Sequence, residues 1–371
     1  MAGEWKETKL GEILTFANGK ASPERAEGFA FPVYGSNGII GFANETNSEP
    51  NSIIIGRVGS YCGSLYFSRE ACWVTDNAIR AVAINNNSPH FSFYLLSTLQ
   101  LNRWRGGSGQ PLLNQSTLSI IPVQIPPPEE QRAIACILGA LDDKIELNRR
   151  MNETLEQIAQ AIFKKWFIEP TKKGKLPEGW KVSKLGDIAD VNWGDTNVTK
   201  KSYVDYGFLA FSAKGPDGFL PYYDYNRVGV VVSAIGANSG YTWLARGKWS
   251  CIKNTIRFWA IAPDISTEYL YFITHGNHIW PIRGSAQPFI SQTDARNLPI
   301  LHPADALAKQ FGEIVAPMFE KMYFNDQQSR TLAALRDTLL PKLISGELRV
   351  PDSEKICARG ASALGGMERC L

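Results

Sequence analysis

The sequence has no long apolar run, and its first residues lack the pattern expected of a secretory signal. Its 371 residues contain no uninterrupted apolar stretch of about 18 residues, so no segment is expected to span a membrane. The N-terminus has no basic segment followed by an apolar run, so it is not a secretory signal. The six cysteines form no CxxC pair and no metal-ligand spacing, which indicates reduced thiols in a cytoplasmic protein without a metal site.

The motifs that enzymes of several classes need are also missing. No GxxxxGK[ST] phosphate loop occurs. No [Asn/Asp]-Pro-Pro-[Tyr/Phe] motif of an amino-methyltransferase occurs either, because the prolines at 126–128 lead into Glu129. The four histidines are scattered, apart from His275 and His278, which have no cysteine nearby. The sequence therefore predicts no catalytic residue and no cofactor.

A strong charge of one sign is absent as well. Lys and Arg number 39 against 36 Asp and Glu, which gives a net charge of +3. A protein that grips DNA alone usually has a stronger basic face. Either DNA is not the ligand, or partner subunits supply much of the contact with the phosphates.

What the sequence does contain is an internal repeat. Residues 77–80, Asn-Ala-Ile-Arg, return 177 residues later as residues 254–257, Asn-Thr-Ile-Arg. Residues 110–115, Gln-Pro-Leu-Leu-Asn-Gln, return at the same offset as Gln-Pro-Phe-Ile-Ser-Gln from residue 287. Further matches keep the same order along the chain, so the two halves indicate a duplication.

Each half begins with a lobe of short β-branched runs separated by glycine-rich turns and ends with one long helical pattern. The expected fold class is α+β: two tandem mixed α/β lobes and two long helices that form an antiparallel coiled coil, related by a pseudo-twofold internal repeat. The expected segments are lobe 1 (1–126), a first long helix (127–169), a linker with lobe 2 (170–303), a second long helix (304–346) and a C-terminal tail (347–371).

Both long helices carry an apolar seam that alternates by three and four residues, a pattern that needs a partner helix. Asn148 and Asn325 fall midway along the two seams. They either lie together and fix the register, or are solvated. The seams hold, in the first helix, Ile134, Leu138, Leu141, Ile145, Asn148, Leu155 and Ile162, and, in the second, Phe311, Val315, Met318, Met322, Asn325, Leu332 and Leu339.

At this level the chain resembles a known family. Residues 176–180 (Leu-Pro-Glu-Gly-Trp) open the second half, residues 339–348 (Leu-Leu-Pro-Lys-Leu-Ile-Ser-Gly-Glu-Leu) close it, and residues 141–145 (Leu-Asp-Asp-Lys-Ile) lie in the first helix. Together with the repeat, these segments resemble the specificity subunit of Type I restriction–modification systems over about residues 4–350. The segment 356–371 matches nothing in that family.

The resemblance implies a function. Each lobe would be a target-recognition domain that reads one half of a split site in double-stranded DNA, and the coiled coil would fix the number of unread bases between the halves. Two methyltransferase subunits, using S-adenosylmethionine, would methylate one adenine per half-site. Restriction subunits driven by ATP can join such a complex. The chain itself would catalyse nothing.

Candidate DNA contacts are polar residues on or near glycine-rich loops, where the backbone can approach DNA closely. Gln110 and Gln287, shared by the lobes, can instead be structural, and Arg80 and Arg257 can be phosphate clamps or pair with internal carboxylates. The candidates are Lys20, Arg25, Arg57, Tyr61, Arg80, Arg103, Arg105, Ser108 and Gln110 in lobe 1, and Lys200, Lys201, Lys214, Asn238, Tyr241, Arg257, Arg283, Ser285 and Gln287 in lobe 2.

Two other functions are compatible with the composition. A duplicated coiled-coil scaffold that binds proteins rather than DNA would explain the nearly neutral charge. An unfamiliar enzyme with a duplicated active site would explain the repeat. The glycine, arginine and amide loops favour DNA recognition.

Overall fold

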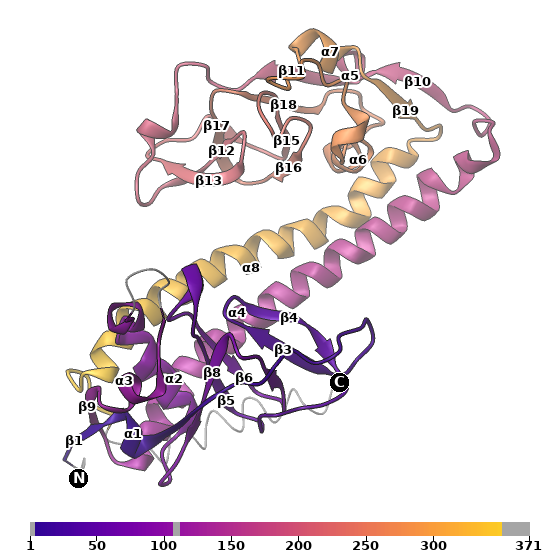
Figure 1. The fold of residues 1–371 in the computed structure, drawn as a ribbon. Helices are drawn as coiled ribbons and strands as arrows, with labels where there is room; N and C mark the ends of the chain where they lie inside the picture. Colours follow the sequence, from indigo (N-terminus) through magenta and orange to yellow (C-terminus); the bar gives the residue numbers. More distant parts are fainter. Residues whose placement is uncertain (1–3, 107–111, 351–371) are drawn as a thin grey trace. The chain divides into compact units, whose positions relative to one another are not determined.

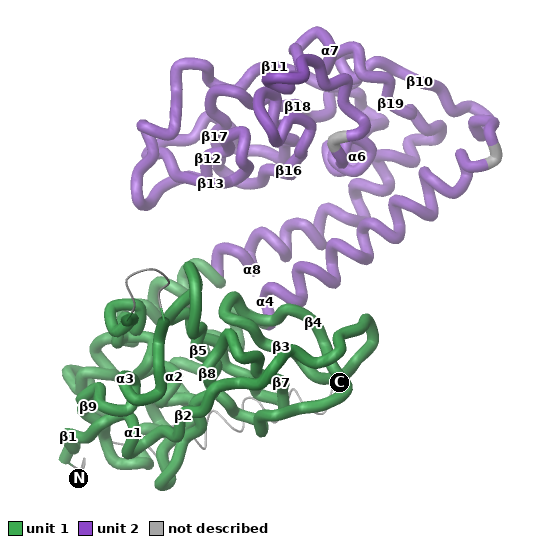
Figure 2. The backbone as a smooth tube through the Cα atoms, in the orientation of Figure 1, with its two compact units in different colours: residues 1–146, 329–371 green, residues 147–328 purple. Residues whose placement is uncertain are grey.

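The chain folds into two compact units (Figure 2). The computed structural model describes residues 4–106 and 112–350. Unit 1 comprises residues 1–146 and 329–371, and unit 2 comprises residues 147–328. Both long helices pass from one unit into the other, so each unit contains a part of each helix.

Two groups of predictions lie outside the described residues. They are the predicted DNA contacts Ser108 and Gln110, and the part of the predicted C-terminal tail beyond Val350.

Unit 1 contains three sheets, with strand orders β1–β9, β2–β8–β5–β6 and β4–β3–β7 (Figure 1). Only β3 and β7 pair in parallel; the other paired strands of this unit are antiparallel within the described residues. Its strands are β1 (Lys6–Lys9), β2 (Leu14–Asn18), β3 (Phe31–Gly35), β4 (Gly38–Ala43), β5 (Ser52–Gly56), β6 (Leu65–Ser68), β7 (Trp73–Val74), β8 (Ala78–Ala83) and β9 (Pro122–Ile125). Its shorter helices are α1 (Leu10–Ile13), α2 (Pro89–Thr98) and α3 (Gln115–Ser119), with 3-10 turns η1 (Gly59–Tyr61) and η2 (Leu101–Trp104).

Unit 2 repeats this plan, with strand orders β10–β19, β11–β18–β15–β16 and β13–β12–β17–β14. The short strand β14 is the addition. Its strands are β10 (Lys181–Lys184), β11 (Ala189–Trp193), β12 (Phe208–Ser212), β13 (Gly215–Leu220), β14 (Tyr225–Asn226), β15 (Gly229–Ser233), β16 (Thr242–Ala245), β17 (Lys248–Cys251), β18 (Thr255–Ala260) and β19 (Pro299–His302). Its shorter helices are α5 (Leu185–Ile188), α6 (Thr267–Ile273) and α7 (Gln292–Arg296), with further turns η4 (Pro170–Lys173), η5 (Lys200–Ser202) and η6 (Asn277–Ile279).

The central strand of each four-stranded sheet is buried on both faces, which explains its unbroken apolar run. In β5, Ile53 and Ile55 join the core formed with α2, α3 and the start of the first long helix, whereas Ile54 points to the smaller sheet. In β15, Val230 and Val232 likewise join the core with the helices, whereas Val231 packs on the smaller sheet. Each unit is thus layered as helices, a four-stranded sheet and a smaller sheet, since side chains alternate along a strand.

The two long helices are α4 (Pro128–Phe163) and α8 (Leu307–Ile344). Proline at the first position and acidic residues in the first turn favour the start of α4. A π-helical turn, η3 (Lys164–Ile168), continues it. In unit 1, Arg336 of α8 donates to Asp142 of α4 at 2.7 Å. In unit 2, Asn152 of α4 donates to Asp326 of α8 at 2.8 Å, so the end of each helix lies beside the beginning of the other.

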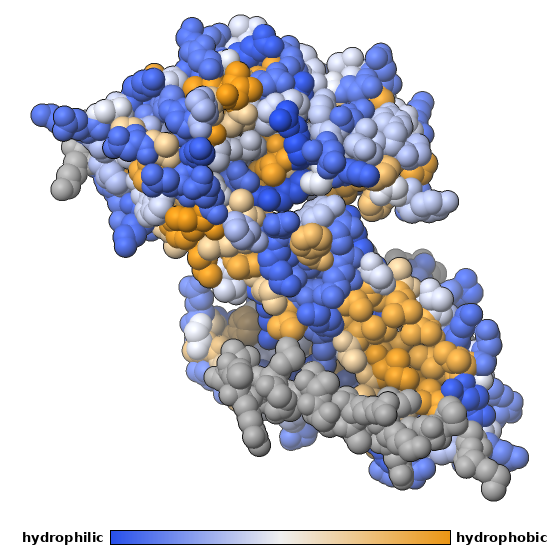
Figure 3. Space-filling model, turned by 180° about the vertical axis from the view of Figure 1, so that it is seen from behind, coloured by the Kyte–Doolittle hydropathy of each residue, from blue (hydrophilic) through white to orange (hydrophobic). Residues whose placement is uncertain are grey.

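The face of the molecule seen in Figure 3 is mostly hydrophilic, with an apolar area on unit 1. Exposed apolar side chains of that unit include Ile120 and Leu335. Among the described residues, no helix combines the length and apolar character needed to cross a bilayer.

Candidate nucleic-acid interface

Each unit builds the same framework from two loops. In unit 1, Gly63 N–H donates to the carbonyl of Gly56 at 2.8 Å, and Leu113 N–H donates to the carbonyl of Arg57 at 3.0 Å. In unit 2, Gly240 N–H donates to the Ser233 carbonyl at 2.9 Å, and Ile290 N–H donates to the Ala234 carbonyl at 2.8 Å. The turn after β5 or β15 and the loop before α3 or α7 are therefore joined in the same way in both units.

Gly63 is required by this framework in unit 1. Its φ of +88° lies in the left-handed region, and a Cβ atom on it would lie 2.7 Å from the backbone nitrogen of Asn102. Gly240, its counterpart in unit 2, has a φ of +91°. Gly63 therefore serves the backbone, since the absence of a side chain lets η2 approach the β5–β6 turn.

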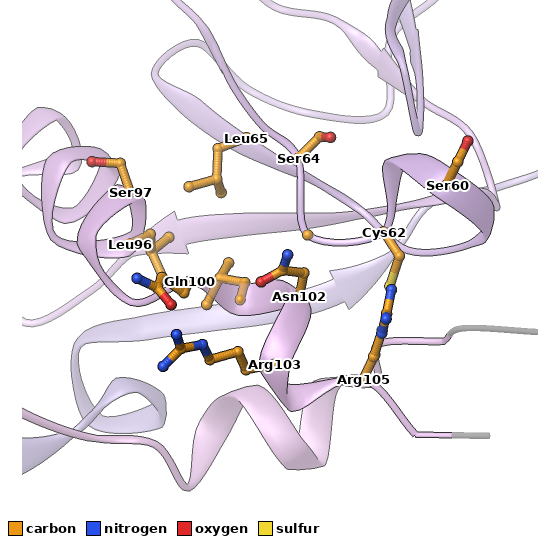
Figure 4. A pocket seen from close by; sticks show the side chains of 12 residues that line it. Ser60, Cys62, Ser64, Leu65, Leu96, Ser97, Gln100, Asn102, Arg103 and Arg105 are labelled. Carbon is orange, nitrogen blue, oxygen red and sulfur yellow. The ribbon is translucent and has the colours of Figure 1, made fainter. Parts of the chain in front are cut away.

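A polar hollow of about 860 Å³ opens between this turn, the end of α2 and η2 in unit 1 (Figure 4). Serines and amides dominate its wall, and two arginines stand at it. The residues that line it are Ser60, Cys62, Gly63, Ser64, Leu65, Leu96, Ser97, Gln100, Leu101, Asn102, Arg103 and Arg105. The unit 1 hollow therefore gathers several hydrogen-bonding side chains on one region of the surface.

The structure brings four predicted DNA contacts of lobe 1 to this region. Arg103 and Arg105 are exposed, and they flank Asn102 in the close-up view (Figure 4). Tyr61, 53% exposed, lies in the adjoining turn. Arg57, half-buried, donates to the carbonyl of Asp76 at 3.1 Å.

The cysteine in the hollow is not a reactive group. Burial raises the pKa of the Cys62 thiol, and the backbone N–H of Leu113 and the charge of Arg105 only partly oppose this. The thiol group donates to the carbonyl of Arg57 at 3.3 Å. It therefore stays protonated at neutral pH and helps to hold the turn.

The other candidates of lobe 1 lie elsewhere or are engaged. Lys20 is exposed beside the β7–β8 turn, where its backbone N–H donates to Val74 at 3.0 Å. Arg25 donates to the carbonyl of Ile40 at 2.8 Å, on the smaller sheet. Arg80 is half-buried and donates to the carbonyl of Asn47.

In unit 2 the equivalent region presents amide, hydroxyl and aromatic groups. Asn238 donates to the carbonyl of Ala213 at 3.3 Å, which places it beside the exposed Lys214. Tyr241 is 53% exposed. Ser285 and Gln287 are exposed on the loop before α7.

Two cations of lobe 2 are tied to carboxylates at the surface. Lys200 forms an ion pair with Asp217, whereas Lys201 is exposed. Burial works to raise the pKa of the Asp217 carboxyl, but hydrogen bonds from Lys200, Ser212 and Tyr203 outweigh it and lower that pKa. Arg283 pairs with Asp294, whose pKa is lowered by a hydrogen bond from Ser291 and by the charge of Arg283.

Arg80 and Arg257, for which the sequence allowed a phosphate clamp or an internal partner, both have internal partners. Arg257 is 9% exposed. Its guanidinium donates to Asp190 at 2.9 Å and lies 4.1 Å from the centre of the Trp259 ring. Arg80, which is half-buried, donates to the backbone carbonyl of Asn47 within lobe 1. The carboxylate partner of Arg257 and the carbonyl partner of Arg80 favour a structural role over a phosphate clamp for these two residues.

Sequence reasoning did not select the serines and amides that line the unit 1 hollow: Ser60, Ser64, Ser97, Gln100 and Asn102. Gln100 adopts a left-handed backbone with a φ of +46°, which turns the chain from α2 into η2. A sequence signal existed, because Gln100 and Asn102 lie close to the arginines in the sequence, but nothing in the sequence placed them in one hollow with Ser60.

Comparison with known proteins identifies the class. The family model of the Type I restriction modification DNA specificity domain matches residues 2–157 and again residues 177–329. The chain is 29% identical over 303 residues to the Type I restriction enzyme MjaIX specificity subunit of Methanocaldococcus jannaschii, with 71% of this chain and 69% of that protein covered. It is 24% identical over 363 residues to the HindI specificity subunit of Haemophilus influenzae, with 70% and 77% covered.

A solved structure agrees with this class at the level of fold. The crystal structure of a Type-I restriction-modification system S subunit from M. genitalium has a TM-score of 0.69, covers 92% of this chain and 96% of that chain, and is 17% identical.

The chain belongs to the Type I restriction–modification DNA specificity family, which confirms the resemblance seen in its sequence. It is a sequence-specific DNA-recognition subunit and not an enzyme. Its duplicated lobes are two copies of the family's domain, so a protein-binding scaffold is not favoured.

Proposed function

We propose that the chain reads a split DNA site, one half with each lobe, and brings two adenine-methyltransferase subunits to it. The observation that carries this proposal is the two-loop framework, which both units build with the same backbone hydrogen bonds. Two equivalent readers in one chain are suited to two separate DNA segments.

The side chains on the two frameworks differ, which supports two different half-sites. At an offset of 177 residues, Tyr61 of lobe 1 corresponds to Asn238 of lobe 2, and Arg105 corresponds to Ile282. Base edges in the major groove are distinguished by such differences in donors, acceptors and apolar groups.

We propose further that α4 and α8 form an antiparallel coiled coil that fixes the gap between the half-sites. With 36 and 38 residues, helices of this kind are about 54 and 57 Å long. Of the seam positions, Ile134, Leu138, Phe311 and Val315 are fully buried. The remaining apolar ones are half-buried: Leu141, Ile145, Leu155, Ile162, Met318, Met322, Leu332 and Leu339.

Partner subunits account for the small net charge of +3. When methyltransferase subunits enclose the duplex, they supply most of the phosphate contacts, and the lobes need only read bases. Those subunits would hold the S-adenosylmethionine, and restriction subunits would join the same complex. The apolar area on unit 1 (Figure 3) supports a protein partner, because such areas commonly mark protein contacts.

Lengthening both helices tests the proposal. We would insert seven residues in α4 and seven in α8 at facing positions next to Asn148 and Asn325, and map methylated adenines in cells that also contain the methyltransferase subunit. Two helical turns add about 10.5 Å, so the gap should grow by about three base pairs while both half-sites stay the same.

Changed half-site sequences with an unchanged gap would contradict the proposal. A single-helix insertion is the control, because it misaligns the seams and should abolish methylation.

A further inference from the structure

The arginines of lobe 2 are all engaged within unit 2. There are five in residues 176–303. Arg246 pairs with Glu268 at 2.9 Å, and Arg257 pairs with Asp190 at 2.9 Å. The others are Arg283, which pairs with Asp294, Arg296, which donates to the Val191 carbonyl, and Arg227, which lies over the Trp259 ring.

Lobe 1 uses its arginines differently. It has six in residues 1–126. Four have partners within unit 1: Arg25 with the Ile40 carbonyl, Arg57 with the Asp76 carbonyl, Arg69 with Asp143, and Arg80 with the Asn47 carbonyl. Among the described residues, Arg103 and Arg105 form no hydrogen bond or ion pair, and both stand at the unit 1 hollow.

We propose that Arg103 and Arg105 read guanine, so that the half-site recognised by lobe 1 contains a G·C pair that these arginines specify. This inference rests on the proposed function and deepens it. A guanidinium presents two parallel N–H donors, which match the O6 and N7 acceptors of guanine in the major groove. Asn102 directly precedes Arg103 in the sequence, and Asn102 and Ser60 also line the unit 1 hollow, so neighbouring base edges can meet further polar groups (Figure 4).

The comparison of the lobes favours bases over phosphates as the targets. Phosphates are the same in both half-sites, so an arginine that a lobe uses for a phosphate contact should recur at the equivalent position of the other lobe. Lobe 2 has Ile282, 39% exposed, at the position of Arg105, and its neighbour Arg283 is held by Asp294. A cation present in only one lobe is expected where the two half-sites differ.

The test uses the full chain together with its methyltransferase subunit, in cells that lack other adenine methylation. Methylated adenines are mapped for the wild type and for the variants Arg103→Gln and Arg105→Gln. We expect guanine in one wild-type half-site, and about 10- to 100-fold weaker discrimination at that base pair in at least one variant. The other half-site and the gap should be unchanged.

Arg69→Gln is the matched control. It removes the same charge from an exposed arginine of the same unit, but one that pairs with Asp143 away from the unit 1 hollow. It should leave the recognised sequence unaltered. Thermal unfolding of each variant checks that the fold is retained, which is expected since Arg103 and Arg105 are exposed.

Three results would overturn the guanine proposal. The first is a split wild-type site without guanine in either half, and the second is a loss of methylation at all sites without a change of sequence, which indicates phosphate contacts. The third is that both variants methylate the same sites as the wild type, with the same discrimination. None of these results contradicts the proposed recognition of a split site. A wild-type protein that directs methylation to no split motif would overturn both that function and the guanine proposal.

Discussion

The side-chain amide of Asn148 donates to the main-chain carbonyl of Asn325 at 3.3 Å, and both residues are buried, at 0% and 1% exposure. Asn148 also donates to Gln328 at 3.0 Å, and Asn325 donates to Asn152 at 2.8 Å. The sequence left open whether the two asparagines are solvated. They are not, and buried polar groups that bond to one another between helices restrict how those helices can slide.

Replacing both asparagines should affect the stability of the helix pair and its register differently. In the variant Asn148→Leu/Asn325→Leu, apolar groups fill the polar centre, so the thermal midpoint should rise or stay level. Since no polar pair then fixes the register, methylation should extend to sites with more than one gap length. A rise in stability with one unchanged gap would show that the apolar seam alone sets the register.

Two glycines of the unit 1 turn should differ in their tolerance of alanine. Gly59→Ala meets no atom within 4 Å, so it should cost about 1–2 kcal/mol from its φ of +71° alone. Gly63→Ala adds a clash with the backbone of Asn102, so it should destabilise further and weaken recognition of one half-site. Equal unfolding free energies and equal methylation patterns for the two variants would contradict the assigned role of Gly63.

The end of α8 should stabilise unit 1. Leu343 is 1% exposed and packs in the core that lobe 1 forms with the start of α4. Leu343→Ala should cost about 2–5 kcal/mol, while Leu335→Ala, at a 46% exposed position of the same helix, should change stability by less than about 0.5 kcal/mol. Hydrogen exchange should speed up across residues 1–126 and stay unchanged in residues 176–303.

Glu130 should contribute a pH-dependent part of the stability of unit 1. It accepts hydrogen bonds from Arg349 at 2.9 Å and from Val350 N–H at 3.2 Å. Burial works to raise the pKa of the Glu130 carboxyl, but these hydrogen bonds outweigh it and hold that pKa below its usual value. The bonds therefore stabilise the fold above the pKa of the unfolded chain, about 4.3, and are lost as the pH falls through the lowered value.

Glu130→Gln measures this contribution. The variant should melt below the wild type at pH 7, and the difference should shrink as the pH falls below about 4.3. A difference that is constant from pH 7 to pH 3 would show that the carboxylate charge plays no part. Glu129→Gln, beside it in the same helical turn, is the control.

Much of the fold was accessible to sequence reasoning because the signals are local. Proline and acidic residues mark the start of α4, and an apolar seam that alternates by three and four residues marks both long helices. The apolar runs of β5 and β15 also marked strands. The sequence did not show which layer each side chain of these strands contacts. Ile54 and Val231 pack on the smaller sheets, opposite to their neighbours, because of the layers that tertiary folding places on each side of the strand.

The candidate site was accessible only in part. Glycine-rich segments indicated Arg103 and Arg105, which the structure brings to one hollow. The same reasoning proposed Arg257, whose partner Asp190 lies far away in the sequence. Residue type shows that an arginine can bind DNA, but whether its charge is already used depends on contacts between distant segments.

The sequence by itself determined that the chain is a repeat with two lobes and two long helices, because periodicity, turn residues and the offset of 177 are properties of the linear chain. Only the tertiary structure decided that unit 1 is completed by the end of α8, with Leu343, Ile344 and Val350 in its core. The tertiary structure likewise decided which arginines stay unpaired among the described residues. Burial and pairing bring together residues far apart in sequence, and no local pattern records which of them will meet.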